Sequence, residues 1–303
     1  MSIINVSWID SFRLSARASR IKQGWAASSR PGVAFHDLPQ ATLRVRVGGV
    51  RKAGSPTVVM VCDPPNVLEH FDALFELIAP HARVIVFEPP GFGFSCPKRG
   101  FRFTFDEYRA CVESLLQTLD EGPYVLAFTC VWGHIALQIA VNHPALIARL
   151  LLWQCPSWDQ QVTWARQLAE KRPLSRPVLG QLATAWKLEE SGLRWYKIAL
   201  AKDRYPDFMP ALQDALPHGS FCCLASLWQQ WFYGYAPPPV QVQQPTLVSW
   251  GIADRTHARS DKRSLAGQVA HAKWHSFEYA GHSPELESSQ EYFELLRAWI
   301  GEK

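Results

Sequence analysis

Short, uninterrupted apolar runs recur along the chain and alternate with segments whose apolar residues have helical spacing. The clearest runs are at 57–61, 84–87, 124–128, 150–153 and 246–250. Runs of this kind are typical of strands that are buried on both faces of a parallel sheet. Helical spacing occurs at 71–79, 133–140 and 286–300. The pattern predicts an α/β fold, with a mostly parallel central sheet flanked by helices on both faces.

Two further segments predict strands of the same sheet. Residues 42–47 alternate apolar and polar side chains, which indicates a half-exposed edge strand ended by Gly48 and Gly49. Residues 273–277 predict the last strand of the chain. The final helix then follows at 286–300.

The first 35 residues precede these strands and helices, and we interpret them as an N-terminal extension. Residues 11–25 predict an amphipathic helix with several basic side chains. The segment is rich in Arg and Ser and poor in acids, as transit peptides are. We favour a helix or arm that packs over the core or its entrance, because composition alone is weak evidence of targeting.

Residues 156–240 interrupt the alternation of strands and helices. They predict several short helices separated by Pro and Gly, and a stiff connector at Ala236-Pro237-Pro238-Pro239 ends the segment. We therefore divide the chain into the extension 1–35, a core of 36–155 and 241–303, and a helical insertion of 156–240.

Composition and charge argue against several classes of function. The formal net charge is only +4, without a basic stripe among aromatic residues, so we expect no nucleic-acid partner. No apolar run is long enough to span a bilayer, and we expect no secretory signal. The seven cysteines lack framework spacing and predict reduced thiols in a cytoplasmic protein. Neither a metal-ligand spacing nor a cofactor motif occurs, so we expect no metal and no organic cofactor.

The candidate chemistry centres on the junction between the run at 124–128 and the helix at 133–140. Only four residues connect them, and Cys130 lies among these. A side chain on such a turn is held away from the sheet, at a helix N-terminus whose dipole favours negative charge. We therefore expect the Cys130 thiol to lose its proton more easily than an ordinary cysteine, and the thiolate is the reactive form.

This strand, turn and helix resemble the nucleophile elbow of the α/β-hydrolase superfamily, usually written G-x-S-x-G, with Cys130 in place of the serine. Phe128 and Trp132 stand where that motif has glycines. Residues 88–95 also resemble the superfamily's D-x-P-G-x-G-x-S loop. The resemblance implies the α/β-hydrolase fold, with residues 156–240 as a helical cap over the carboxyl ends of the strands.

The same resemblance implies a catalytic acid and a base. Asp254 matches the acid in a W-G-x-x-D pattern, and His282 matches the base in Gly281-His282-Ser283-Pro284. His282 would take the Cys130 proton and later protonate the leaving group, while Asp254 would orient the imidazole. Asp159 is the alternative acid.

Several other residues are interpreted as structural. We expect His134 to be packed or capping and His257 to lie on the surface. Four cysteines are expected to be structural: Cys62, Cys96, Cys111 and Cys155. Aromatic cap helices suggest an apolar substrate pocket beside Phe128, Trp132 and Trp158. Most cap tryptophans are expected only to pack the cap against the core.

The oxyanion hole of the superfamily departs most from its usual pattern here. One expected donor is the N–H of Val131. The second would come from the loop after an early strand, where Pro64 aligns with the usual donor and has no N–H. Either Asp63 or Asn66 supplies it, or the reaction does not pass through a stabilised oxyanion.

The leading functional prediction is an enzyme that hydrolyses or transfers the acyl group of a hydrophobic ester or thioester, as thioesterases and acyltransferases of biosynthetic pathways do. Its partner would be a small hydrophobic or acyl substrate, free or carrier-bound. Two alternatives stay open: a lyase, cyclase or isomerase that uses His282, and a non-catalytic ligand-binding protein on the same fold.

Overall fold

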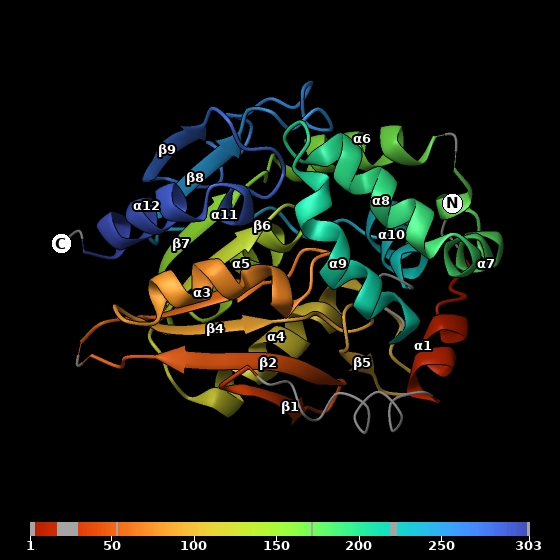
Figure 1. Cartoon of the computed structure of the whole chain (residues 1–303), viewed down its shortest axis with the longest axis horizontal. Helices are drawn as coiled ribbons and strands as arrows, with labels where there is room; N and C mark the ends of the chain where they lie inside the picture. Colours follow the sequence, from red (N-terminus) through yellow and green to blue (C-terminus); the bar gives the residue numbers. More distant parts are fainter. Residues whose placement is uncertain (1–3, 17–29, 53, 171, 219–222, 302–303) are drawn as a thin grey trace.

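We analysed a computed structural model, which describes residues 4–16, 30–52, 54–170, 172–218 and 223–301 (Figure 1). Its strands are β1 Val33–Asp37, β2 Ala41–Gly49, β3 Thr57–Val61, β4 Arg83–Phe87, β5 Cys96–Pro97, β6 Tyr124–Thr129, β7 Ile147–Trp153, β8 Thr246–Gly251 and β9 Ala272–Phe277. Its α-helices are α1 Trp8–Ser15, α3 Asp72–Ile78, α4 Phe105–Leu119, α5 Trp132–Asn142, α6 Trp158–Ala169, α7 Leu179–Trp186, α8 Leu188–Ala199, α9 Tyr205–Ala215, α10 Leu224–Phe232, α11 Pro284–Glu287 and α12 Ser289–Gly301. Short 3₁₀ turns lie at η1 Leu68–Phe71, η2 Pro173–Ser175 and η3 Leu216–His218.

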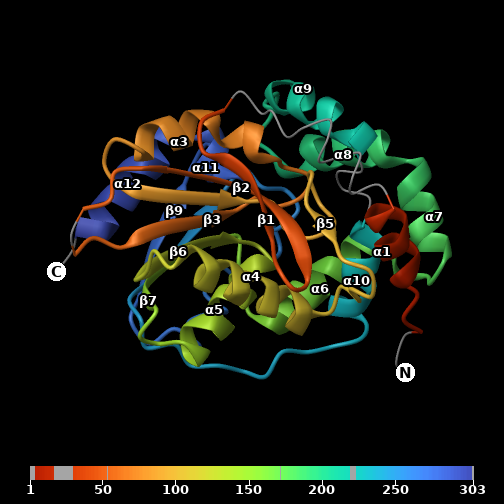
Figure 2. The same ribbon diagram turned by 90° about the horizontal axis from the view of Figure 1, so that it is seen from below.

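One sheet contains these strands, in the order β1-β2-β4-β3-β6-β7-β8-β9, with β5 paired to β2. All pairs from β4 to β9 are parallel, while β2 is antiparallel to β1, β4 and β5. Figure 2 shows α4 and α5 on one face of the sheet and α3, α11 and α12 on the other. The mostly parallel sheet flanked by helices is therefore confirmed.

Alternate residues of the central strands enter two separate cores. Val59, Leu126 and Leu152 pack with α4 and α5, whereas Met60 and Leu151 pack with α3 and α12. This explains why the strands read as continuous apolar runs, because a strand covered on both faces buries each of its side chains.

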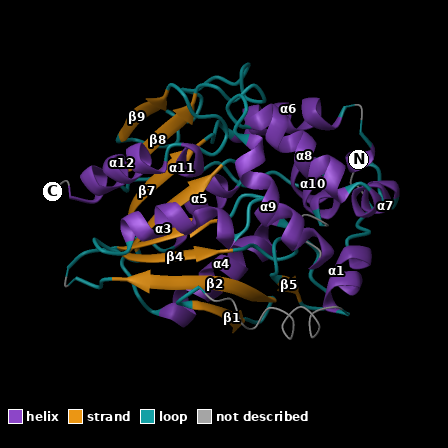
Figure 3. Cartoon of the chain, in the orientation of Figure 1, coloured by secondary structure: helices purple, strands orange, loops and turns teal. Residues whose placement is uncertain are grey.

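Helices α6 to α10 lie between β7 and β8 in the chain and form the helical insertion. Figure 3 shows them beyond the end of the sheet toward which the arrowheads of the parallel strands point, while β2 points away from them. In the described part of the chain, no helix has both the length and the apolarity needed to cross a membrane.

Three expectations about the elements were wrong. β2 is not an edge strand, because β1 pairs with it and lies outside it. The single final helix is two helices, α11 and α12, which are interrupted at Ser288. The first helix, α1, begins at Trp8 rather than at residue 11, and residues 17–25 of the expected helix lie outside the described residues.

Helix α1 does pack on the rest of the molecule. The buried Asp10 carboxylate accepts a hydrogen bond of 2.7 Å from Ser226 Oγ on α10, and Ser11 Oγ donates to the Lys98 carbonyl. These contacts place the N-terminal segment against both the insertion and the core, as the favoured interpretation of the extension expects.

Candidate active site

Cys130 occupies the turn between β6 and α5. Its backbone has a φ of +50°, a left-handed conformation that is uncommon outside glycine. Its N–H donates to the carbonyl of Trp153 at the end of β7, at 2.8 Å. The parallel pairing of β6 with β7 and of β7 with β8 brings the carboxyl ends of these strands together. The topology therefore carries Cys130 toward the loops that contain the other candidate residues.

The turn forms without the usual glycines because the side chains of Phe128 and Trp132 point away from the positions where the backbone is closely packed. Phe128 points into the core and packs against Phe87, with ring centroids 5.9 Å apart. Trp132 is buried, and its indole N–H donates to Asp63 Oδ1 at 3.0 Å. The close approach occurs one residue later, where a Cβ on Gly133 would lie 2.5 Å from Cys155 Sγ. The position where a side chain would clash is therefore Gly133, and not Trp132 where the motif has its glycine.

The structure brings Asp254 and His282 together with Cys130. The distance between His282 Nδ1 and Asp254 Oδ2 is 2.7 Å. The Cys130 sulfur and one ring nitrogen each of His282 and His257 all lie within 4.8 Å of one another. His282 is placed by its own backbone N–H, which donates to the carbonyl of Ala199 at the end of α8. The expected acid, base and nucleophile thus share one site.

Asp254 is held by donors on both of its oxygens. Gln154 Nε2 donates to Oδ2 at 2.7 Å, and the backbone N–H and hydroxyl of Thr256 both donate to Oδ1. Gln154 also accepts from the N–H of Gly251, at the end of β8. The sequence analysis missed Gln154; the available signal was a polar residue directly after a buried strand, at the edge of the sheet where sites form. Asp159, the alternative acid, is exposed on α6 and is not part of this network.

The electrostatics of the pair favour a charged His282. Burial disfavours ionisation of Asp254, but the His282 charge and the hydrogen bonds to the carboxylate lower its pKa to about 2. Burial also opposes the imidazolium, yet the Asp254 charge prevails and raises the pKa of His282 well above its ordinary value. A buried His between carboxylates holds its proton at neutral pH.

The expectation of an acidic thiol was wrong. Burial raises the pKa of the Cys130 thiol above its ordinary value of 9.0, although the His282 charge and a hydrogen bond from the Val131 N–H act in the other direction. The sulfur also accepts a 3.5 Å contact from Gln161 Nε2 on α6. Desolvation therefore outweighs the helix dipole at this turn.

This gives a prediction for the reactivity of Cys130 with iodoacetamide. We expect its alkylation rate to be low at neutral pH and to rise above pH 9, because only the thiolate reacts. His282→Gln should shift the profile to still higher pH, since the imidazolium charge that favours the thiolate is lost. Rates are read from peptide mapping of Cys130 across a pH series. A profile below that of a free thiol in the native protein would contradict the prediction.

His257 is not a surface residue, as had been expected. It is buried, and its ring stacks on Trp164 at 4.5 Å and on His282 at 5.4 Å. Its Nδ1 interacts with Ser260 Oγ at 2.9 Å, and desolvation lowers its pKa to about 3. His257 is therefore a neutral imidazole beside the charged one. His134 is buried and packs edge-on against Trp158, as expected of a packed histidine.

A thiol and two imidazoles are ligands that Zn²⁺ takes in proteins. For a tetrahedral zinc ion the donor atoms would be ~3.5 Å apart, as Zn–S and Zn–N lengths require. His282 Nδ1 is committed to Asp254, and His282 Nε2 lies 3.3 Å from Asp63 Oδ2. The geometry thus favours proton transfer around His282 over a metal centre.

The expected oxyanion donors are only partly available. The Val131 N–H points at the Cys130 sulfur. Asn66 is not among the cavity residues: its side-chain amide donates to Ser283 Oγ, its side-chain oxygen accepts from Tyr196, and its backbone N–H donates to the Asp63 carbonyl. The Asp63 side chain accepts from Trp132 and faces His282, so it presents negative charge rather than a donor. Pro64 lines the cavity.

A cavity of about 360 Å³ leads to Cys130 between the core and the insertion. Trp132 lines it, but Phe128 and Trp158 do not, so the expected pocket was wrong in two of its three residues. Trp158 instead packs against Phe105 and Phe232. Most of the insertion's tryptophans do more than pack, because four of them line the cavity: Trp164, Trp186, Trp195 and Trp228.

Comparison with known proteins shows which family the sequence and the fold resemble. A family model described as "Alpha/beta hydrolase family" matches residues 61–295. The chain is 25% identical over 266 residues to an uncharacterized hydrolase of Saccharomyces cerevisiae. The aligned region covers 79% of this chain and 86% of the relative.

Solved structures share the fold at low sequence identity. An enol-lactonase from Burkholderia xenovorans LB400 has a TM-score of 0.67 and 19% identity, with 89% of this chain and 100% of the other covered. Epoxide Hydrolase A from Mycobacterium thermoresistibile has a TM-score of 0.73 and 13% identity, with 89% and 98% covered. A loop variant of the haloalkane dehalogenase DbeA from Bradyrhizobium elkanii has a TM-score of 0.71 and 15% identity, with 88% and 95% covered.

Proposed function

The chain belongs to the alpha/beta hydrolase family, and we propose that it hydrolyses or transfers the acyl group of an ester or thioester through Cys130, His282 and Asp254. One observation carries this proposal. An Asp254–His282 pair with 2.7 Å between oxygen and nitrogen lies beside a thiol that lines an aromatic cavity. Nucleophile, base and orienting acid are the parts that covalent acyl transfer requires.

The reaction would proceed in two steps. The reacting form is the one in which the Cys130 thiol has lost its proton to solvent while His282 keeps its own. The thiolate attacks the carbonyl carbon and forms a C–S bond, and the bond to the leaving group breaks as His282 gives that group its proton. Water or another acceptor then gives a proton to His282 and attacks the acyl carbon, which releases Cys130. Asp254 holds His282 in the required tautomer and stabilises its charge.

The geometry around the carbonyl oxygen supports thioesters over unactivated esters. Val131 offers one N–H, and Pro64 offers none. Loss of one oxyanion donor typically lowers the rate about 10²–10³-fold. A thioester substrate and the acyl-thioenzyme are chemically alike. Transfer from a thioester therefore needs less stabilisation of the oxyanion than transfer from an unactivated ester.

The test is to trap the acyl-enzyme. We expect wild-type protein incubated with the decanoyl thioester of N-acetylcysteamine to gain the mass of one decanoyl group, mapped to Cys130. Cys130→Ala should neither gain this mass nor release thiol. Cys155→Ala is the matched control, because Cys155 is buried near the site but does not line the cavity. Unchanged turnover by Cys130→Ala would overturn the proposal.

A second candidate is acid–base chemistry without a covalent intermediate. It is favoured by one observation: Asp63 Oδ2 lies 3.3 Å from His282 Nε2, where a carboxylate competes with Cys130 for the proton and opposes an oxyanion. A lyase or isomerase that moves a proton through His282 would have these features. In that case Asp63→Asn would abolish turnover and Cys130→Ala would not.

A further inference from the structure

The cavity is lined by aromatic, aliphatic and charged side chains, and several of them come from two helices of the insertion. On and just after α6, Trp164, Leu168 and Arg172 recur every four residues, and all three line the cavity. Helix α6 ends at Ala169, so Trp164 and Leu168 lie on the helix and Arg172 lies beyond its end. Trp164 stacks against His257 and His282 at the catalytic end. Arg172 lines the same cavity from beyond the end of this helix.

Helix α8 brings a second arginine to the same cavity. Its residues Glu190, Ser191, Arg194 and Trp195 line the cavity at the spacing of one helix face, and Lys187 precedes them. Trp195 contacts the His282 ring at 5.0 Å. Lys187 and Glu190 form an ion pair of 3.2 Å, which neutralises both.

The two arginines have no such compensation. Among residues that the structure describes, no carboxylate forms an ion pair or hydrogen bond with the side chain of Arg172 or of Arg194. Burial, and after it the charge of Arg194, lowers the pKa of the Arg172 guanidinium. Two like charges at the wall of a cavity repel each other, and the partly buried Arg172 also carries a desolvation cost; an anion between them would relieve both. Guanidinium groups are well suited to carboxylate and phosphate.

We propose that Arg172 and Arg194 bind an anionic group of the substrate other than the carbonyl that Cys130 attacks. The ligand is then an amphipathic acid, with its carbonyl at Cys130, an apolar middle along Leu168 and a carboxylate or phosphate at the arginines. This inference rests on the proposed function only for where the reactive bond lies. The anion-binding step itself can be measured without turnover.

The first experiment measures binding with inert probes, using the fluorescence of the tryptophans that line the cavity. Wild-type protein should bind decanoate and decyl phosphate at least about tenfold more tightly than decanol, the preference of one charge-assisted hydrogen bond. Arg172→Gln/Arg194→Gln should lose this preference while its affinity for decanol is unchanged. Arg176→Gln is the matched control, since this exposed arginine lies outside the cavity. Equal affinity of wild-type protein for the three probes would overturn the inference.

The second experiment identifies the source of the anion. KM is compared for decanoyl N-acetylcysteamine, for decanoyl coenzyme A, and for the N-acetylcysteamine monothioester of decanedioic acid. If Arg172→Gln/Arg194→Gln raises KM for decanoyl coenzyme A alone, the site binds a phosphate on the leaving thiol. A rise for the dicarboxylic acid alone assigns it to a carboxylate on the acyl chain, and no rise for either overturns the inference. Anion preference without any acylation of Cys130 would instead contradict the proposed function and leave the anion site standing.

Discussion

Asp254→Asn should reduce kcat by about 10⁴-fold, although it changes only one atom of the side chain. Each hydrogen bond at Asp254 comes from a donor: Gln154 and His282 on Oδ2, and the N–H and hydroxyl of Thr256 on Oδ1. An asparagine must turn its NH₂ group toward one of these pairs. If it faces His282, the imidazole accepts at Nδ1 and carries its only proton on Nε2, so the imidazolium charge that favours the Cys130 thiolate is lost.

The matched control is Asp159→Asn, an exposed acid on α6 that the sequence alone also allowed as the triad acid. It should leave kcat unchanged.

Asp254 also contributes about 2 kcal/mol of stability at neutral pH, because its pKa is about 2 in the fold and 3.8 when free. The depressed pKa means that this term is present above about pH 4 and is lost as the pH falls toward 2. Activity should therefore be measured where circular dichroism shows both variants folded; full activity of Asp254→Asn would remove Asp254 from the triad.

The sequence predicted the positions of Cys130, Asp254 and His282 because their signals are local. Each follows a strand of the sheet, and the parallel order of β6, β7, β8 and β9 places the residues after these strands at one edge. The structure brings the three together, while their catalytic roles stay a proposal. Gln154 could have been found by the same rule, since it comes directly after β7.

The features that sequence analysis missed depend on contacts between distant segments. His257 looks like a polar loop residue, and only the packing of Trp164 from α6 buries it. Phe128 is next to the elbow in sequence, yet the alternation of β6 directs it into the core. Burial also reversed the expected direction of the Cys130 pKa, which local helix geometry alone would lower.

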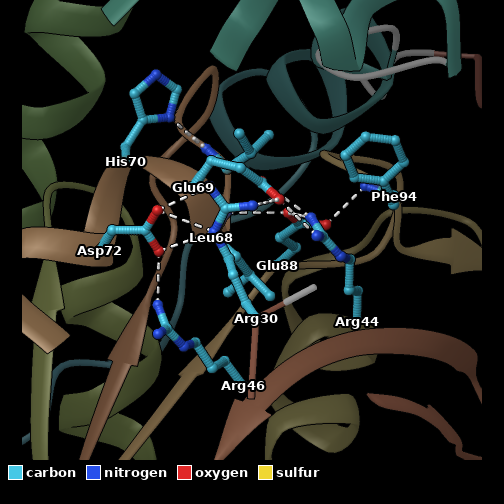
Figure 4. A network of polar contacts seen from close by, with 10 residues as sticks. Arg30, Arg44, Arg46, Leu68, Glu69, His70, Asp72, Glu88 and Phe94 are labelled. Atoms are coloured by element: carbon cyan, nitrogen blue, oxygen red, sulfur yellow. Dashed lines mark hydrogen bonds and ion pairs between the residues drawn. The ribbon is translucent and has the colours of Figure 1, made fainter. Parts of the chain in front are cut away.

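The error at β2 has the same origin. Arg44 and Arg46 alternate with apolar residues, which is the pattern of a strand with one solvent-exposed face. In the structure both are buried, at 0% and 5% exposure, because acids from other segments neutralise them. Figure 4 shows Arg44 facing Glu69 and Glu88, and Arg46 facing Asp72.

This network leads to the largest expected effect on stability. Arg44→Met should cost about 3–5 kcal/mol, the usual result of removing one partner from a buried charge cluster. Arg44 donates to both Glu69 oxygens, at 2.6 and 3.0 Å, and to Glu88 at 3.1 Å. Arg204→Met, the control, breaks an exposed 3.4 Å pair with Asp207 and should change the free energy of unfolding by no more than about 0.5 kcal/mol.

The pH dependence of that loss distinguishes a charge effect from a packing effect. Burial raises the pKa of Glu88 from 4.5 to about 7 even with Arg44 present, so Glu88 stabilises the fold in its protonated form and loses this contribution as the pH rises from 4.5 to 7. Without Arg44 its pKa rises further, and the loss extends to higher pH. Urea unfolding should therefore show that Arg44→Met lowers the free energy of unfolding more at pH 8 than at pH 5. An equal loss at both pH values would indicate lost packing alone. The Glu88 carboxylate also accepts from the Phe94 N–H, in the loop that carries the cavity residue Phe92, so the same variant should weaken ligand binding.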